Sequence, residues 1–249
     1  MRSLVAGNWK MNGLTSDALE RAQAICAKAG DGLPCDVLVC PPATLIGTMT
    51  RAFQDSGITL GGQDCHAEDS GAYTGDVAAP MLADFGCSHV IVGHSERRRD
   101  HAESDALIAS KAAAAHRAGL VAIICLGESA TEREEGRASD VVSAQLAGSL
   151  PPGATPDNTV VAYEPVWAIG TGNTATPTDV AEIHALLRQQ LVAALGEDGN
   201  NVRLLYGGSV NAGNADELLS VDHVNGALVG GASLKPDDFW AIVSAGRSA

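Results

Sequence analysis

Eight short runs of apolar residues recur along the chain, and each is followed by a segment whose apolar positions have helical spacing. The runs are continuous rather than alternating, and β-branched residues are common in them. This pattern is typical of parallel strands that are buried on both faces. The predicted strands are residues 4–7, 37–40, 58–63, 89–93, 120–125, 159–163, 202–206 and 226–229.

The segments between these strands are predicted to be helical. They are residues 18–29, a segment ending near residue 53, and residues 81–85, 102–118, 131–150, 178–195, 212–219 and 236–245. No linker or shift in composition divides the chain. Eight strand–helix repeats within 249 residues therefore predict a single domain, residues 1–249, in which eight parallel strands close into a (β/α)₈ barrel ringed by helices.

The composition excludes several classes of protein. A formal net charge of −14 opposes binding to nucleic acid or to an anionic membrane surface. No apolar run approaches the roughly 20 residues that span a bilayer. The six cysteines form no C-x-x-C pair and have no histidines at zinc spacing. We therefore expect reduced thiols, a cytoplasmic location, and neither a metal nor another cofactor.

Polar residues and glycines gather where the predicted strands end. In a (β/α)₈ barrel these strand ends share one rim, so residues far apart in the sequence converge there. The groups at this rim are Asn8 with Lys10, His94 with Ser95 and Glu96, Glu164, Gly207 to Ser209, and Gly230 with Gly231. This convergence is stronger evidence for a functional site than any one of the residues.

The stretch from Ala162 to Gly172 combines a carboxylate with a hinged loop. Glu164 stands at a strand end, and Pro165 biases it away from helical angles. An apolar centre between proline and glycine hinges predicts a lid that excludes water from a base. The predicted lid is Pro165, Val166, Trp167, Ala168, Ile169, Gly170, Thr171 and Gly172. The alternative is a strand end on a wet surface, with Trp167 simply packed.

The other rim groups suit a phosphorylated substrate. Glycine pairs let backbone N–H groups approach an anion, although they are also common in tight turns. Lys10 would supply a local positive charge, unless it is an ordinary solvated lysine. His94 precedes a predicted helix start, which favours a neutral imidazole that donates a hydrogen bond; the alternative is a structural histidine. Together these groups favour proton transfer beside a carbonyl.

Five motifs extend this pattern over essentially the whole chain. They are residues 7–12 (GNWKMN), 93–98 (GHSERR), 162–172 (AYEPVWAIGTG), 206–210 (YGGSV) and 228–234 (LVGGASL). In their order and spacing they resemble the triosephosphate isomerase family. The resemblance implies a TIM barrel that interconverts dihydroxyacetone phosphate and D-glyceraldehyde 3-phosphate in glycolysis and gluconeogenesis, without a cofactor.

The resemblance also implies a role for each rim residue. Glu164 would move a proton between neighbouring carbons, and His94 would polarise the carbonyl and move protons between the oxygens. Lys10 and Asn8 would bind substrate and stabilise developing negative charge, while Glu96 would order the site. The phosphate would be held by Lys10 and by the backbone at Gly170, Ser209, Gly230 and Gly231.

A further implication of the resemblance is a homodimer whose third loop inserts into the partner. Residues 71–75 (GAYTG) match that loop, so Tyr73 and Thr74 are expected at the interface. Thr74 is expected near Asn8 and Lys10 of the partner subunit. Departures from the family pattern leave interface strength and lid kinetics open; they are Asp64, Asp76, Ala78 and Asn173.

Two other functions stay open at this point. A phosphate-binding barrel isomerase of amino-sugar or aromatic biosynthesis would share the glycine-rich strand ends. It should, however, lack the combination of Asn8, Lys10, His94 and Glu164. A barrel retained only as a binding or structural protein would show a substitution among those residues. Cys125, at a fifth strand end, either packs against the catalytic carboxylate or fills the core.

Overall fold

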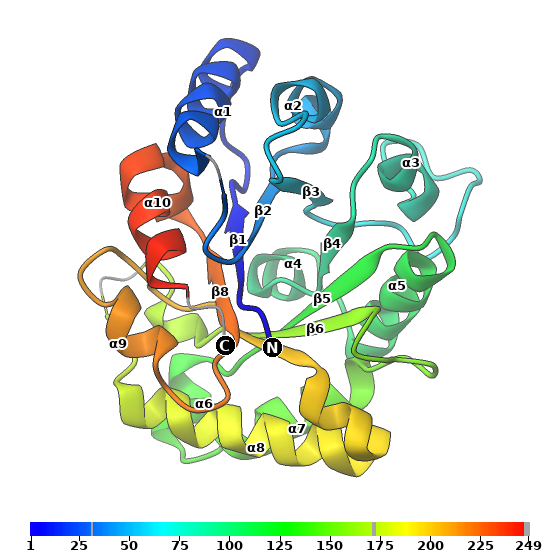
Figure 1. Cartoon of the computed structure of the whole chain (residues 1–249). Coiled ribbons are helices and arrows are strands. Elements are labelled where there is room, and N and C mark those ends of the chain that lie inside the picture. Colours follow the sequence, from blue (N-terminus) through cyan, green and yellow to red (C-terminus); the bar gives the residue numbers. More distant parts are fainter. Residues whose placement is uncertain (31, 171–172, 247–249) are drawn as a thin grey trace.

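Eight parallel strands close into a barrel in chain order, with β1 paired to both β2 and β8. The computed structural model describes residues 1–30, 32–170 and 173–246, and Figure 1 shows the helices around the strands. The strands are β1 (Leu4–Asn8), β2 (Asp36–Cys40), β3 (Thr59–Gly62), β4 (His89–Val92), β5 (Val121–Leu126), β6 (Thr159–Tyr163), β7 (Arg203–Tyr206) and β8 (Gly226–Val229). The predicted barrel is confirmed.

Helices connect successive strands in the described part of the chain. They are α1 (Thr15–Ala29), α2 (Ile46–Ala52), α3 (Ala79–Asp84), α4 (Ser95–Asp100), α5 (Asp105–Arg117), α6 (Ala130–Glu134), α7 (Ala138–Ser149), α8 (Pro177–Leu195), α9 (Ala215–Leu219) and α10 (Pro236–Ala245). Short 3₁₀ turns are η1 (Ala43–Leu45), η2 (Val166–Ala168), η3 (Gly196–Asn201) and η4 (Gly231–Leu234). None of the helices described is long and apolar enough to cross a membrane.

The two faces of the strands enter two separate apolar clusters. One cluster consists of strand residues alone and fills the inside of the barrel, whereas the other also contains residues of the surrounding helices. In β1, Leu4 and Ala6 belong to the inner cluster and Val5 to the outer one. Successive side chains of a strand point to opposite faces, and here both faces are apolar. This is why the strands appear in the sequence as continuous apolar runs.

The same alternation aims the polar residues at the strand ends. Asn8 stands two residues after Ala6, and Glu164 stands two residues after Ala162, so both continue the inner face. Cys125 of β5 also belongs to the inner cluster and is fully buried. The carboxylate and the amide therefore point into the mouth of the barrel rather than toward the helices.

Three helical predictions are wrong in extent, and one of them is residues 212–219, of which only Ala215–Leu219 form a helix, α9. Residues 131–150 form two helices, α6 and α7, because the chain turns between them at Gly136, whose φ is 72°. Residues 102–104 are not helical. Helix α5 begins after Ser104, whose hydroxyl caps it by accepting a hydrogen bond from the N–H of Leu107 at 3.3 Å.

Candidate active site

A cavity of about 530 Å³ opens at the carboxyl ends of the strands. Its walls come from the ends of β1, β4, β6, β7 and β8, which are far apart in the sequence. The lining includes the predicted residues Asn8, Lys10, His94, Glu164, Gly170, Ser209, Gly230 and Gly231. The predicted interface residues Tyr73 and Thr74 lie elsewhere, on an exposed loop before α3.

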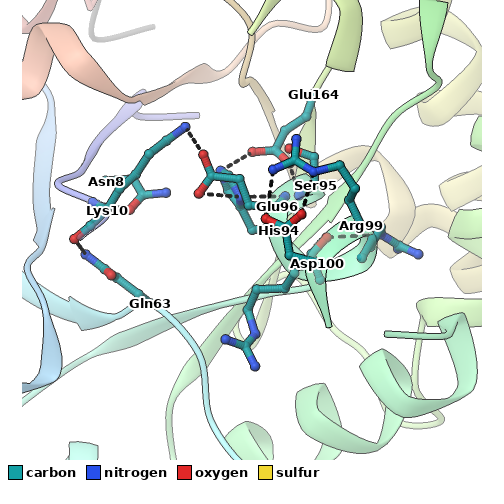
Figure 2. Close-up of polar contacts among 12 residues, drawn as sticks. Asn8, Lys10, Gln63, His94, Ser95, Glu96, Arg99, Asp100 and Glu164 are labelled. Atoms are coloured by element: carbon teal, nitrogen blue, oxygen red, sulfur yellow. Dashed lines mark hydrogen bonds and ion pairs between the residues drawn. The ribbon is translucent and has the colours of Figure 1, made fainter. Parts of the chain in front are cut away.

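The Glu164 carboxylate faces the ring of His94 (Figure 2). Oε1 of Glu164 lies 3.0 Å from Nε2 of His94, and Oε2 accepts a hydrogen bond of 2.9 Å from the N–H of Ser95. Ser95 is the first residue of α4, so the carboxylate lies at a helix N-terminus, where a negative charge is stabilised. Glu164 is only 1% exposed. A buried, ionisable base is thus held in contact with an imidazole.

His94 reaches the cavity because the chain turns at Gly93. The φ of Gly93 is 68°, and a side chain added there would collide with Ile108 of α5. After this turn, Nδ1 of His94 accepts a hydrogen bond of 3.2 Å from the N–H of Glu96 and caps α4. A ring that accepts at Nδ1 carries its proton at Nε2, which is therefore the donor toward the carboxylate.

Charge coupling shifts the pKa values of both groups. Burial raises the pKa of Glu164, but His94, the N–H of Ser95 and Lys10 together lower it below its ordinary 4.5. Burial lowers the pKa of His94, but the Glu164 carboxylate outweighs burial and raises it above the ordinary 6.5. A substrate that separated the carboxylate from the ring would remove the main cause of the raised His94 pKa.

Lys10 is held in a backbone conformation that few non-glycine residues adopt, with a φ of 51°. Its N–H donates to Oδ1 of Asn8 at 3.0 Å, and Nε2 of Gln63 donates to its carbonyl at 2.8 Å. The ammonium group forms an ion pair of 2.6 Å with Glu96, close to His94 in Figure 2. A strained backbone conformation persists only where surrounding contacts impose it. The hydrogen bonds from Lys10 to Asn8 and from Gln63 to Lys10 therefore fix the place from which the lysine side chain starts.

Gly230 and Lys10 share one corner of the cavity. A Cβ added at Gly230 would lie 3.5 Å from Cε of Lys10, which is van der Waals contact, so the lysine side chain lies directly beside this backbone. The hydroxyl of Ser233 donates to the carbonyl of Gly230 at 2.7 Å and to that of Asn8 at 3.5 Å. The ends of β8 and β1 are thus linked behind a cation and exposed backbone, an arrangement suited to an anion.

The predicted lid borders this cavity. Val166–Ala168 form η2, and Ile169 and Gly170 line the cavity itself. Gly170 has a φ of 69°, which glycine adopts readily at a hinge. The lid residues Thr171 and Gly172 lie outside the described residues.

The start of the lid is tied to Glu128, a fully buried carboxylate. Oε1 of Glu128 accepts hydrogen bonds from Nε1 of Trp167 at 2.8 Å and from the Tyr163 hydroxyl at 3.1 Å. Arg133 donates to the same oxygen at 3.1 Å, and its guanidinium lies 4.9 Å from the centre of the Trp167 ring. The indole therefore cannot move without breaking a charge-assisted hydrogen bond.

Glu128 and Gln63 were not among the residues predicted for the site. Each stands just after a strand, β5 and β3 respectively, on the rim where functional groups gather. Gln63 donates to the carbonyls of both Lys10 and Cys40, and so joins the ends of three strands. Their position at strand ends was the available signal, but their partners follow only from the folded chain.

A buried ionic cluster lies under the loop that follows β3. Lys111 contacts both oxygens of Asp64 at 2.8 Å and Oε1 of Glu103 at 2.6 Å. Arg97 of α4 also contacts Asp64, at 3.0 Å, and Glu103, at 2.6 Å. Burial raises the pKa of Asp64 above its ordinary 3.8, although the two cations oppose this effect. The cluster thus connects the loop to the helix that begins next to His94.

The Asp64→Asn variant is expected to be more stable than the native chain at pH 7. Because the folded-state pKa of Asp64 is raised, the folded chain binds this proton more tightly than the unfolded chain does. The free energy of unfolding therefore falls as the pH rises through the interval above 3.8. The gain is expected to be no more than about 1 kcal/mol, because Lys111 and Arg97 each lose Asp64 as a charged partner and keep Glu103, so the unfolding temperature should rise by at most about 2–4 °C in a chain of this size.

Thermal unfolding at pH 7 and at pH 5 tests this expectation, because the advantage of Asp64→Asn should shrink as the pH falls. The control is Asp69→Asn in the same loop, whose ion pair with Arg117 is exposed and should contribute little. A lower unfolding temperature for Asp64→Asn at pH 7 would show instead that the ion pairs of Asp64 stabilise the fold.

The barrel and its cavity define the class of a (β/α)₈-barrel enzyme with a carboxylate, an imidazole and an ammonium group on the wall of one cavity. Within the described residues, no group of three or more His, Cys, Asp or Glu side chains is placed to hold a metal. The family model for triosephosphate isomerase matches residues 3–246. The chain belongs to the triosephosphate isomerase family.

Individual relatives agree with this assignment. The triosephosphate isomerase of Afipia carboxidovorans is 58% identical over 98% of each chain. That of Rhizobium meliloti is 55% identical over 98% of this chain and 96% of its own. The crystal structure of triosephosphate isomerase from Bartonella henselae superimposes with a TM-score of 0.92 at 50% identity, covering 98% of this chain and 99% of that one. This family membership sets aside the barrel isomerases of amino-sugar and aromatic biosynthesis.

Proposed function

We propose that this chain catalyses the interconversion of dihydroxyacetone phosphate and D-glyceraldehyde 3-phosphate. Membership of the triosephosphate isomerase family supports this reaction and its place in glycolysis and gluconeogenesis. The chain is then an intramolecular aldose–ketose isomerase. The observation that carries the proposal is the buried contact of 3.0 Å between Glu164 and His94, on the wall of a cavity that also holds Lys10.

Glu164 is the proposed base. It removes a proton from the carbon beside the carbonyl, and the electron pair moves onto the carbonyl oxygen to give an enediolate. The same carboxyl group returns the proton to the neighbouring carbon. Its lowered pKa keeps it ionised at neutral pH, as a base requires. Because Ser95 and His94 occupy both oxygens, the carboxylate must leave these partners to reach the substrate.

His94 is the proposed electrophile. Its Nε2–H would donate to the carbonyl oxygen and, as the enediolate forms, would exchange protons between the two substrate oxygens. The hydrogen bond from Glu96 N–H to Nδ1 leaves that nitrogen without a proton, which supports a neutral ring. A neutral imidazole can give its Nε2 proton to one substrate oxygen and take a proton back from the other, which is general acid–base catalysis by one positioned side chain.

Lys10 and Asn8 are proposed to stabilise the negative charge that develops on the substrate oxygens. The Lys10 ammonium is already fixed in the cavity wall by its ion pair with Glu96 at 2.6 Å, which gives Glu96 an ordering role. The phosphate dianion would lie in the corner that Lys10 shares with Gly230, and would be held by the backbone of Gly231 as well. Ser209 and Gly170, which line the same cavity, complete the proposed phosphate site.

The lid is proposed to close over the bound substrate. Closure would remove water, strengthen the charge interactions of the site and protect the enediolate from loss of phosphate. If closure moves Trp167, its hydrogen bond to Glu128 must break. A coupled assay with D-glyceraldehyde 3-phosphate tests the proposed function directly; a folded chain without isomerase activity would contradict it.

We also propose that the chain is a homodimer. Large apolar side chains are exposed on the β1–α1 loop, on the loop before α3, on α3 and at its C-terminal end, and side chains of this kind would be buried by a partner. These residues are Met11, Leu14, Tyr73, Met81 and Phe85. Tyr73 stacks on His66 with ring centres 3.9 Å apart, which gives the exposed loop around Tyr73 and Thr74 a defined shape. The six free thiols support a reducing, cytoplasmic setting.

The Met11→Asp variant is expected to weaken this dimer by about tenfold or more, because an unpaired carboxylate would be buried at the interface. Met11 is 96% exposed in the single chain, so the change should leave the barrel itself intact. Sedimentation of the native and variant chains at falling concentration measures the effect. The matched control is Ala193→Asp on the exposed face of α8. Equal dissociation constants for the native and Met11→Asp chains would exclude Met11 from the interface.

A further inference from the structure

Arg21 of α1 reaches across to the segment that follows β8. Its Nε donates a hydrogen bond of 2.8 Å to the carbonyl of Leu234, the last residue of η4. Its guanidinium carbon lies 4.7 Å from the centre of the Trp9 ring. One side chain therefore contacts two segments that are more than 200 positions apart in the sequence.

The guanidinium group of Arg21 is only partly satisfied by hydrogen bonds. Nη1 of Arg21 is buried and makes no hydrogen bond to any described residue. Burying an unpaired N–H of a charged group is unfavourable, so packing must hold it there. The stacking on Trp9 compensates in part, because a cation over an indole ring is attracted to the ring face. The position of the guanidinium is thus set by the ring and by one carbonyl.

Both segments that Arg21 joins belong to the proposed phosphate site. Trp9 lies between Asn8 and Lys10, and Trp9 and Leu234 themselves line the cavity. The segment that ends at Leu234 begins at Gly231 and follows Gly230 directly. The ammonium group and the glycine backbone can hold one phosphate only if these two segments keep a constant separation.

We infer that Arg21 is a positioning residue for phosphate binding. It clamps the Trp9–Lys10 segment against η4, so that the Lys10 ammonium and the backbone of Gly230 and Gly231 converge on the same anion. Arg21 acts through these groups and does not touch the substrate. The inference rests on the proposed function, because it names the residue that holds the phosphate site of that reaction in shape.

The Arg21→Gln variant tests the clamp. We expect the KM for D-glyceraldehyde 3-phosphate to rise about tenfold and kcat to change by less than about threefold, because ground-state and transition-state binding of the phosphate are weakened alike. The dissociation constant for inorganic phosphate, measured by calorimetry, should rise by the same factor as KM. Arg21→Lys keeps a cation next to Trp9 and should give values between those of the native and Gln enzymes.

The matched control is Arg51→Gln, an exposed arginine in the last turn of α2, which should change neither constant. Unchanged phosphate affinity and KM in Arg21→Gln would overturn the inference. A fall in kcat with a lower unfolding temperature but unchanged KM would also overturn it, since Arg21 would then be merely structural. If the native chain lacks isomerase activity while Arg21→Gln still binds phosphate more weakly, the proposed function fails and the clamp stands.

Discussion

The Glu164→Asp variant is expected to lose about 100-fold in kcat, because shortening the side chain withdraws the carboxylate by about 1 Å from the carbon that it must reach. The backbone cannot follow to compensate. The N–H of Glu164 donates to the carbonyl of Leu126 at 2.7 Å, which fixes it to the end of β5, and Pro165 restricts the backbone angles of Glu164 itself. The charge is retained, so the loss measures position rather than the presence of a base.

The assay with D-glyceraldehyde 3-phosphate measures this loss under conditions in which both enzymes are folded. Glu182→Asp, the same change at an exposed position of α8, serves as the control and should leave kcat unchanged. We expect little change in KM, since the phosphate contacts do not involve Glu164. A variant with native kcat would rule out Glu164 as the base and would require another group of the cavity to be assigned.

Replacing His94 by glutamine is expected to lower kcat by about 10²- to 10⁴-fold, the usual contribution of a positioned proton donor and acceptor. The amide nitrogen can still donate to the carbonyl oxygen, but it cannot exchange a proton with the enediolate. The amide oxygen can accept from the N–H of Glu96, so α4 should keep its cap. Unlike Glu164→Asp, this variant keeps the base in place.

His101→Gln is the matched control, because His101 follows the end of α4 on the surface and contributes nothing to the cavity wall. Comparison of unfolding temperatures separates a chemical effect of His94→Gln from loss of the helix. If His94→Gln kept kcat within threefold of the native value, proton transfer by the imidazole would not be required, and polarisation by a neutral amide would be enough.

The site was partly predictable because its residues obey rules that operate along the chain. Asn8 and Glu164 follow apolar strands in the correct alternation, and the Gly93 turn lies next to His94. The barrel fold alone predicts that these residues, which are far apart in the sequence, meet at one rim. The bounds of the predicted helices were less accessible, since residues 131–137 are polar and carry no apolar spacing that marks a boundary, and it is the backbone turn at Gly136 that separates the two helices.

Contacts that side chains make with distant segments could not be predicted. Gln63 holds the strained backbone of Lys10, Glu128 holds Trp167, and Arg21 joins Trp9 to Leu234. Nothing in the local pattern around Gln63, Glu128 or Arg21 names a partner. Each contact depends on which strand ends lie side by side and on the rotamer that packing then allows.

The sequence by itself determined the eight-stranded barrel, its family and the residues at its rim. These follow from the period of apolar positions and from short motifs, which are local properties of the chain. The tertiary structure alone decided which oxygen of Glu164 meets His94, how Lys10 is oriented, and what holds the phosphate corner together. Such features depend on distances of a few ångströms between segments, and only the closed barrel sets those distances.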